Sequence, residues 1–358
     1  MPMERIAVAT LGFVHRFLRR IWHFAKKDER LQSIAYRIRN SRAFSDISQH
    51  ERMLADHVRV ETYHKAICRH VHEGDTVVDL GTGTGILAFF AGQQKAKQVY
   101  AIDHSSIIEL AKTLGAANRL GNVSFLRMHS SQFAPPEKVN VIIHEQIGDA
   151  LLNEDMVRNI CELRDKVLAP DGIILPGRFE LFVEPARLKE TLRVPYLWEN
   201  DIHGIRYEAA EDWVRANVES VPQSRRITPE DVAEFLCEPE SVLSLDLLTA
   251  KPDGVPRQLT FRKVATKSGF MDGYCLYFDA LFDSEVSLST SPFAERTHWN
   301  CQIFRTERLF VREGDTFDVV FDIPNVRDVT TWRINHKLAA RQDDSAGQAP
   351  VPLLAGVR

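Results

Sequence analysis

A glycine-rich turn is the first feature of the sequence that could do chemistry. In the run TVVDLGTGTG, Gly81, Gly83 and Gly85 stand directly after a predicted strand and before a predicted helix. Glycines at such a turn adopt positive φ angles and let the backbone approach a ligand without a clash from Cβ. The spacing is GxGxG rather than the GxGxxG of dinucleotide-binding turns, since Ile86 occupies the sixth position.

A carboxylate in the next predicted strand supports a ligand at this turn. Asp103 ends that strand, twenty residues beyond Gly83. An acidic side chain there can accept hydrogen bonds from both hydroxyl groups of a ribose. The glycine turn and this acid together predict a nucleoside cofactor. S-adenosylmethionine is the first candidate, and NAD is the second.

Two glutamates could form a second reactive site. Glu145 follows the apolar run Val139–His144, at the end of a predicted strand, and Glu154 stands nine residues later, far enough for a loop to return it opposite Glu145. Two carboxylates that face one pocket suit a guanidinium, whose planar fork offers several N–H donors. The nitrogen that is not held could then attack a methyl group activated by the cofactor. The alternative is that both glutamates lie on a solvated loop or helix end.

The surrounding elements indicate an α/β fold. Short β-branched or apolar runs alternate with helix-like stretches at 86–95 and 105–119, a pattern typical of a parallel sheet. The turn signal Pro170-Asp171-Gly172 precedes the last run. The predicted strands are Thr76–Leu80, Gln98–Ile102, Val123–Leu126, Val139–His144 and Ile173–Leu175.

After Pro176 the pattern changes to strand-like runs with few helices. This pattern predicts an antiparallel β-domain with a helical insertion, in which helices are expected around 207–218 and 228–237. The segment after Lys337 is rich in Ala, Gly, Pro and Asp and is expected to be disordered. The predicted strands are Phe179–Val183, Val242–Leu248, Gln258–Lys263, Gly273–Phe282, Asn300–Phe304 and Thr316–Phe321.

Composition narrows the class of protein. The chain has 358 residues, 44% of them hydrophobic, enough for a packed core and two or three structural units. Its five cysteines are scattered and form no CxxC pair, so neither a disulfide framework nor a metal site is expected, and a cytoplasmic location fits best. No uncharged run reaches the ~20 residues that a membrane-spanning helix needs. The net charge of −4 gives no signal for direct nucleic-acid binding.

Charge is unevenly distributed along the chain. Residues 1–42 have a net charge of +7, so the rest of the chain has a net charge of −11. Within this region, residues 11–27 place apolar side chains at helical spacing on one face and Arg, Lys and His on the other. A basic amphipathic helix can lie on an anionic membrane surface or in the groove of a partner. It can also pack against its own domain.

Four segments, in order, resemble motifs of the protein arginine N-methyltransferase family, and the resemblance covers about residues 40 to 335. HERMLAD at 50–56, followed by Arg59, resembles the helix that precedes the family's nucleotide fold, and DLGTGTGIL resembles its first motif. HEQIGDALLNEDM at 144–156 is similar to its double-glutamate loop. Thr297-His298-Trp299 is similar to its threonine-histidine-tryptophan loop.

The resemblance implies a Rossmann-like seven-stranded methyltransferase domain and an antiparallel β-barrel-like domain with a helical dimerisation arm. It also implies S-adenosylmethionine as the cofactor and the guanidino group of an arginine as the acceptor. His298 would accept a proton from the acceptor, and Asp56 would orient this histidine. The implied catalytic residues are Glu145, Glu154, His298 and Asp56.

The resemblance assigns further contacts to the cofactor and the acceptor. His50 and Arg59 would contact the cofactor carboxylate, and Asp79 would lie near its amino group. The implied cofactor-binding residues are His50, Arg59, Asp79, Gly81, Gly83, Gly85, Asp103 and Ser131. The implied acceptor pocket includes Met53, Met156 and Trp299, the last of which is expected to support its loop by packing.

The expected domains follow the same resemblance. They are a basic helical extension at 1–42, a cofactor-binding domain at 43–177, a β-domain at 178–337 and a tail at 338–358. The helical insertion at about 207–238 resembles the family's dimerisation arm, so we expect a homodimer.

Several positions depart from the family pattern. Asn40 and Phe44 stand where the family has paired tyrosines, and Ser131 stands where an acid usually meets the adenine amino group. The loop begins His144-Glu145-Gln146-Ile147 instead of serine-glutamate-tryptophan-methionine. Guanidinium capture should survive these changes, but free arginine or another small guanidine is an alternative to a protein acceptor. A catalytically silent cofactor-binding scaffold and a methyltransferase for a non-guanidine acceptor are further alternatives.

Overall fold

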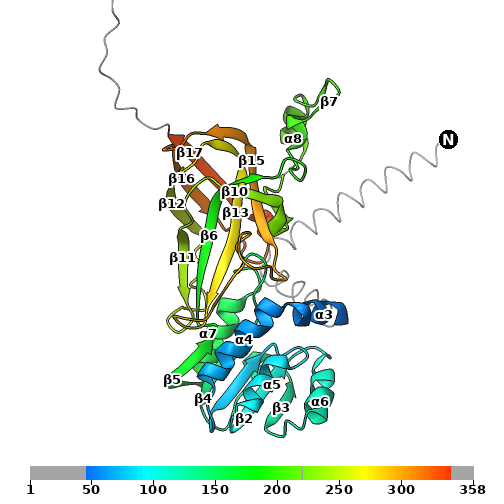
Figure 1. The fold of residues 1–358 in the computed structure, drawn as a ribbon, viewed down its shortest axis with the longest axis vertical. Helices are drawn as coiled ribbons and strands as arrows, with labels where there is room; N and C mark the ends of the chain where they lie inside the picture. Colours follow the sequence, from blue (N-terminus) through cyan, green and yellow to red (C-terminus); the bar gives the residue numbers. More distant parts are fainter. Residues whose placement is uncertain (1–45, 219–220, 340–358) are drawn as a thin grey trace, which may run out of the picture. The chain divides into compact units, whose positions relative to one another are not determined.

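The computed structural model describes residues 46–218 and 221–339 (Figure 1). The predicted helix at 11–27 and residues 340–358 of the predicted tail lie outside this range. None of the helices within it is long and apolar enough to cross a membrane.

The described residues divide into two compact units. Unit 1 comprises residues 46–146 and 162–175, and unit 2 comprises residues 147–161 and those from Pro176 onward. Each unit has its own buried apolar core.

Unit 1 is built on a parallel sheet of five strands in the order β3-β2-β1-β4-β5. All residues of β1 are buried, as expected for the near-continuous apolar runs of parallel strands. The sheet confirms the predicted α/β arrangement. Its strands are β1 (Thr76–Leu80), β2 (Gln98–Asp103), β3 (Val123–Arg127), β4 (Val139–His144) and β5 (Leu168–Leu175).

The two helices that were predicted in unit 1, at 86–95 and 105–119, begin and end close to those positions. Aspartates at two helix starts accept hydrogen bonds from backbone N–H groups, Asp46 from Ser48 and Asp56 from Arg59, and such caps stabilise a helix N-terminus. The helices are α3 (Ile47–Ala55), α4 (His57–His70), α5 (Ile86–Gln93) and α6 (Ile108–Ala117), with the 3₁₀ turn η1 at Ser130–Gln132. A further helix, α7 (Met156–Val167), begins in unit 2 and ends in unit 1.

The expected count of seven strands is wrong for the described part of this sheet. After β5 the chain enters β6 (Arg178–Leu188), which pairs antiparallel with β13 (Gly269–Leu281) of unit 2. The backbone N–H of Gly177 already donates to the carbonyl of Leu281 in the same unit. The apolar run that could have formed a sixth strand is therefore used in another sheet.

The strand order fixes where a ligand can bind in unit 1. From β1 the chain continues outward to β2 and β3, whereas β4 and β5 lie on the other side of β1. In open α/β sheets, ligands bind at the carboxyl ends of the strands where the order reverses. The glycine turn follows β1, and Glu145 follows β4, so both predicted motifs stand at this reversal.

Unit 2 consists mainly of antiparallel strands, as predicted after Pro176. A seven-stranded sheet has the path β10-β6-β13-β15-β9, with β11 and β14 paired at its sides, and a three-stranded sheet has the order β12-β16-β17. Phe304 of the larger sheet packs on Phe321 and Trp332 beside the smaller one, which joins the two sheets in one core. The remaining strands are β9 (Ser224–Ile227), β10 (Val232–Phe235), β11 (Ser241–Asp246), β12 (Gln258–Val264), β14 (Ser287–Ser289), β15 (Cys301–Val311), β16 (Thr316–Asp322) and β17 (Arg333–Ala339).

Two expectations for unit 2 are wrong. Residues 228–237 do not form a helix: a short 3₁₀ turn at Pro229–Asp231 leads into β10, because Val232 and Phe235 bury their side chains in the sheet core. The tail does not begin after Lys337, since β17 continues to Ala339 and pairs there with Thr316.

An arm projects between β6 and β9 of unit 2 (Figure 1). It contains helix α8 (Ala210–Asn217) where one was predicted, together with the 3₁₀ turn η2 (Leu197–Glu199) and a hairpin of β7 (Asp201–Ile202) and β8 (Ile205–Arg206). The arm therefore ends before β9, and not near residue 238 as expected.

Candidate functional site

The glycine turn has the backbone that its sequence predicts. Gly81, Gly83 and Gly85 all have positive φ angles, of 77°, 54° and 94°. A Cβ on Gly83 would lie 2.9 Å from Cε1 of the buried His50, too close for any other residue. His50 of α3 therefore lies directly against the middle of the turn, where only a glycine leaves room for it.

Asp79 lies beneath this turn and is fully buried. Its Oδ2 accepts hydrogen bonds from the Thr82 hydroxyl and the Ala88 N–H. Its Oδ1 is also buried but accepts no hydrogen bond. Burial raises the pKa of Asp79 to about 7, although the two hydrogen bonds oppose the shift. A buried carboxylate oxygen with no partner is costly, so this oxygen suits a cationic ligand group.

Asp103 closes the other side of the turn. Its Oδ2 accepts from the Gly83 N–H at 3.1 Å, and its Oδ1 accepts from the Ser105 N–H at 2.8 Å. Each carboxylate oxygen can accept a second hydrogen bond, so these contacts leave capacity for ribose hydroxyls. Ser131 does not share these contacts: it lies exposed in η1, where its hydroxyl meets Nδ1 of His129 at 3.0 Å.

Arg59 and Glu145 form a buried ion pair in unit 1. Their Nη2 and Oε2 atoms are 3.4 Å apart, and the side chains are only 5% and 11% exposed. Nη1 of Arg59 also donates to the carbonyl of Met53 at 3.0 Å. Burial disfavours the charged form of Arg59, but nearby acids, Glu145 first among them, outweigh it and raise the pKa of the guanidinium. The carboxylate of Glu145 thus forms an ion pair with a guanidinium of its own chain.

Asp56 has a structural role that its predicted chemistry did not include. It caps α4 by accepting a hydrogen bond from the Arg59 N–H at 2.9 Å, and it is buried. This cap fixes the first turn of the helix that carries Arg59. The predicted pairing of Asp56 with His298 stays a prediction, since His298 belongs to unit 2.

The loop that carries Glu154 belongs to unit 2, although residues 147–161 were expected in the cofactor-binding domain. The reason is that the Trp299 indole donates to the Ile147 carbonyl at 2.7 Å and Arg226 pairs with Asp149. Glu154 is half-buried, and Met156 is fully buried at the start of α7.

His298 and Trp299 lie next to each other in unit 2. Their ring centroids are 4.0 Å apart, and Trp299 is buried against Phe278 in an edge-to-face contact. The indole hydrogen bond to Ile147 ties this pair to the loop that carries Glu154. Trp299 therefore supports the loop rather than presenting a reactive group.

The candidate residues thus gather in two groups. In unit 1, the contacts described above join the glycine turn to His50, Asp79 and Asp103, and Gly81 lies beside Gln146, the neighbour of Glu145 in the chain. In unit 2, the Glu154 loop is joined to the His298–Trp299 segment. Neither Arg226 nor the Thr82 hydroxyl could be predicted from the sequence, because Arg226 pairs with a residue far away in the chain and Thr82 bonds Asp79 across the turn.

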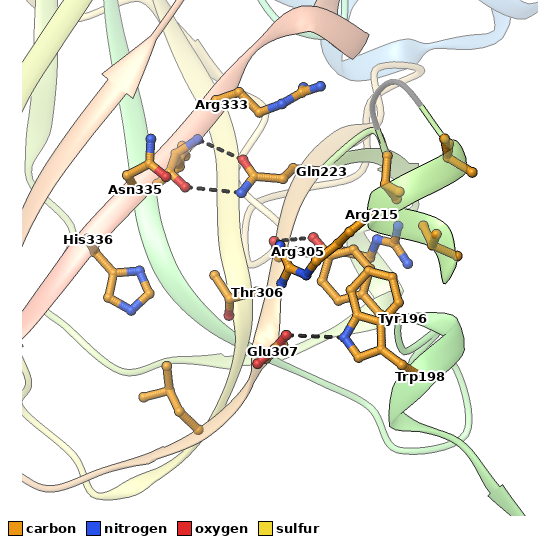
Figure 2. Close-up of a pocket in the computed structure, with 15 residues that line it drawn as sticks. Tyr196, Trp198, Arg215, Gln223, Arg305, Thr306, Glu307, Arg333, Asn335 and His336 are labelled. Carbon is orange, nitrogen blue, oxygen red and sulfur yellow. Dashed lines mark hydrogen bonds between the residues drawn. The ribbon is translucent and has the colours of Figure 1, made fainter. Parts of the chain in front are cut away.

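A large hollow in unit 2 contains none of the predicted site residues. It has a volume of about 730 Å³ and lies between the arm and strands β15 and β17. Figure 2 shows Tyr196 and Trp198 stacked at its side, with ring centroids 4.8 Å apart, while Arg305 covers Tyr196 and Arg215 covers Trp198. This column of rings and guanidinium groups ties the arm to β15.

Comparison with known proteins places these features in context. A family model described as the arginine methyltransferase oligomerization subdomain matches residues 181–335, and one for ribosomal protein L11 methyltransferase matches residues 57–175. Protein arginine N-methyltransferase 6 of Xenopus laevis is 35% identical over 293 residues, which cover 78% of this chain and 84% of that protein. Protein arginine N-methyltransferase 1 of Schizosaccharomyces pombe is 32% identical over 287 residues, 76% of this chain and 81% of that protein.

Solved structures share the fold. The Trypanosoma brucei PRMT1 enzyme–prozyme heterotetrameric complex with AdoHcy has a TM-score of 0.69 at 22% identity, covering 83% of this chain and 98% of that chain. Arabidopsis thaliana protein arginine methyltransferase 10, in an open conformation, also has a TM-score of 0.69, at 23% identity, covering 83% and 99%. Both likenesses extend over the two units.

Proposed function

Since this chain belongs to the protein arginine N-methyltransferase family, we propose that it methylates the guanidino group of an arginine or of a small guanidine with S-adenosylmethionine. The observation that carries the proposal is Glu145, at the carboxyl end of β4, whose buried carboxylate already pairs with a guanidinium, that of Arg59. The glycine turn after β1 supplies the cofactor cradle in the same unit.

The residues of unit 1 fit this cofactor. When bound, S-adenosylmethionine supplies a methyl group on a positively charged sulfur and leaves as the neutral thioether. Asp79, whose buried Oδ1 accepts no hydrogen bond, would receive the ammonium group, and Asp103 would receive the ribose hydroxyls. Gly83 donates its N–H to Asp103, and its lack of a Cβ lets His50 lie against the turn. Arg59 would bind the cofactor carboxylate, a pairing that suits the guanidinium fork.

Glu145 and Glu154 would bind the acceptor guanidinium. Bidentate pairing with carboxylates fixes the plane of the group and holds some of its N–H bonds, which leaves the free nitrogen oriented toward the methyl group. The support for Glu145 is its ion pair with Arg59, and the support for Glu154 is its place in a loop with many fixed contacts, described below.

A proton must leave the guanidinium as the new N–C bond forms, because a free guanidinium is always protonated. We assign its acceptance to His298, since an imidazole nitrogen can act as a general base. The adjacent Trp299, held at Ile147, restricts the position of this histidine. Asp56 is proposed to orient it.

The proposed activity is tested with a panel of acceptors. Purified protein is incubated with labelled S-adenosylmethionine and histones, Gly/Arg-rich peptides or free L-arginine, and the products are resolved by mass. We expect transfer to a guanidino nitrogen and its loss in Glu154→Gln, with cofactor affinity unchanged because Glu154 is proposed to bind the acceptor and not the cofactor. Cofactor binding without turnover on the whole panel would favour a silent scaffold, and a methyl group off any guanidine would establish another acceptor.

We also propose that the chain forms a homodimer through its arm. The support is the match of residues 181–335 to an oligomerization subdomain and the apolar side chains that the arm exposes. Ile205 and Trp213 are each 64% exposed, and Ile202 is 50% exposed. The stacked rings of Tyr196 and Trp198, with Arg305 over Tyr196, tie the arm to β15 (Figure 2).

A further inference from the structure

A carboxylate outside the predicted catalytic set connects the two candidate reactive segments of unit 2. We propose that Asp149, with Arg226, is a positioning pair that sets the geometry of both Glu154 and His298. This inference rests on the proposed methyl transfer to a guanidine and identifies residues that such a reaction needs without touching the acceptor.

Both carboxylate oxygens of Asp149 have a partner in unit 2. Oδ2 lies 2.7 Å from Nε of Arg226 on β9, and Oδ1 accepts the Asn300 N–H at 3.0 Å. The Asn300 amide lies beside the same guanidinium, with its oxygen 2.6 Å from Nη2 of Arg226 in the orientation that satisfies both groups. The Asp149 side chain is 18% exposed and that of Arg226 is 58% exposed, so the carboxylate is largely shielded while the guanidinium reaches water. Exposed ion pairs add little to stability, and the pair matters here for the geometry that it sets.

The other end of the loop is fixed by a second ion pair. Asp155, directly after Glu154, accepts from Nε of Arg327 at 2.6 Å. Between the two anchors, the Asn153 side chain accepts the Ala150 N–H, and a Cβ on Gly148 would clash with it at 2.3 Å. The loop is therefore compact, with little room for alternative conformations.

The loop backbone is strained where it carries Glu154. Leu151 and Asp155 have φ angles of 59° and 56°, a left-handed conformation that costs about 1–3 kcal/mol for a residue other than glycine. Such a conformation persists only when the surrounding contacts hold it. The pairs of Asp149 with Arg226 and of Asp155 with Arg327 supply those contacts on either side of Glu154.

The same carboxylate also fixes the segment of His298. Asn300, whose N–H binds Asp149, stands two residues after His298, and Trp299 between them donates to Ile147, two residues before Asp149. The two segments thus run side by side through a pair of hydrogen bonds. Loss of the Asp149 charge would break the pair with Arg226 and weaken the anchor that both segments share, and a shift of about 1 Å in a reacting group can cost on the order of 100-fold in rate.

The test compares five variants of the full-length protein, one of which is the double variant Asp149→Asn/Arg226→Met. Asp149→Asn and Arg226→Met remove the pair from either side, and Arg226→Lys keeps its charge. The control is Arg262→Met, which breaks the exposed Arg262–Asp318 pair between β12 and β16, at 2.8 Å. For each variant we measure kcat and KM for the guanidine acceptor, the Kd for S-adenosylhomocysteine, and hydrogen exchange of residues 147–156 and 297–303.

We expect kcat/KM for the acceptor to fall about tenfold or more in Asp149→Asn and Arg226→Met, with cofactor Kd within about twofold because the glycine turn is in unit 1. Arg226→Lys should recover part of the loss, and the control should match the wild type. The double variant should be no worse than the single ones. Exchange should accelerate in both segments.

Unchanged kcat/KM in both disrupting variants, alongside active wild-type protein, would overturn the positioning role while leaving the proposed function intact. Equal losses in the control would show a nonspecific effect and overturn it as well. A wild type that methylates no guanidine would instead overturn the proposed function, and this role with it.

Discussion

Replacing Asp79 by asparagine should make the ligand-free protein more stable near neutral pH and less stable in acid. Asp79 is fully buried, and its pKa is raised to about 7, compared with about 3.9 for an aspartate in an unfolded chain. Between these values the folded state holds a proton that the unfolded state has lost. The stability that this carboxyl contributes is complete below pH ~4 and is lost as pH rises through about 7.

The magnitude follows from the pKa difference. About three pKa units correspond to about 4 kcal/mol lost by pH 7. Asparagine does not titrate, and its single oxygen can accept the hydrogen bonds from Thr82 and Ala88 that Oδ2 accepts. Its amide nitrogen then takes the place of Oδ1 without a partner, which costs about 1–3 kcal/mol. The variant should be about 1–3 kcal/mol more stable than wild type at pH 7.5, and less stable below pH 5.

Binding of the cofactor should show the opposite preference. A cationic amino group beside Oδ1 favours the ionised carboxylate, so wild-type affinity should fall about tenfold for each pH unit below 7. The Asp79→Asn variant should bind more weakly and without this pH dependence. One substitution would thus raise the stability of the empty protein and remove its ligand, a trade-off seen where function needs a strained or uncompensated group.

Native-state hydrogen exchange of the β1 and β2 amides reports the opening free energy of unit 1. We would measure it from pH 5 to 7.5, with and without S-adenosylhomocysteine, and determine proton release on binding by calorimetry in two buffers. Asp171→Asn is the matched control, because it makes the same change at an exposed position of unit 1. Parallel stability curves for wild type and Asp79→Asn, or binding without proton release at pH 6, would refute the reasoning.

Three further predictions concern other parts of the chain. Lys263→Met should destabilise unit 2 by about 3–5 kcal/mol in urea, because it leaves the buried Glu184 without its cation; adding Glu184→Gln should restore most of the loss, and full stability of the single variant would contradict this. Trp213→Asp should shift the protein from dimer to monomer in light scattering, an idea that fails if the wild type is itself monomeric at micromolar concentration. Deletion of residues 1–30 should abolish co-sedimentation with anionic liposomes, and no sedimentation of the intact protein would rule out membrane binding.

The sequence predicted those elements whose backbone conformation is determined by residues close together in the chain. Strand β1 and the turn after it could be placed because a β-branched run and three glycines determine their own backbone. The position of Glu145 followed in the same way from the end of the run Val139–His144. Residues 228–237 were mistaken for a helix because helix and strand patterns are hard to distinguish in short segments.

Pairings between distant residues could not be predicted. Arg59 and Glu145 are separated by 86 positions, and nothing in either segment indicates that they meet. The sequence placed Asp149 in the double-glutamate motif without indicating a role for it, and Arg226 stands in a strand that was not predicted. The missing strands of the expected seven have a similar cause, since the partner that β6 takes in unit 2 depends on β13, about ninety residues away.

Burial and a raised pKa do not by themselves identify the reactive carboxylate. Glu184 and Asp79 are both buried, and burial raises the pKa of each to about 7. Glu184, however, lies 2.7 Å from Nζ of Lys263, a cation in the same core. No described residue forms an ion pair with Asp79, whose Oδ1 accepts no hydrogen bond. Glu184 and Lys263 thus form a structural pair, whereas the Asp79 carboxylate is proposed to receive its cation from the bound cofactor. That difference, rather than the pKa, makes Asp79 the group to test first.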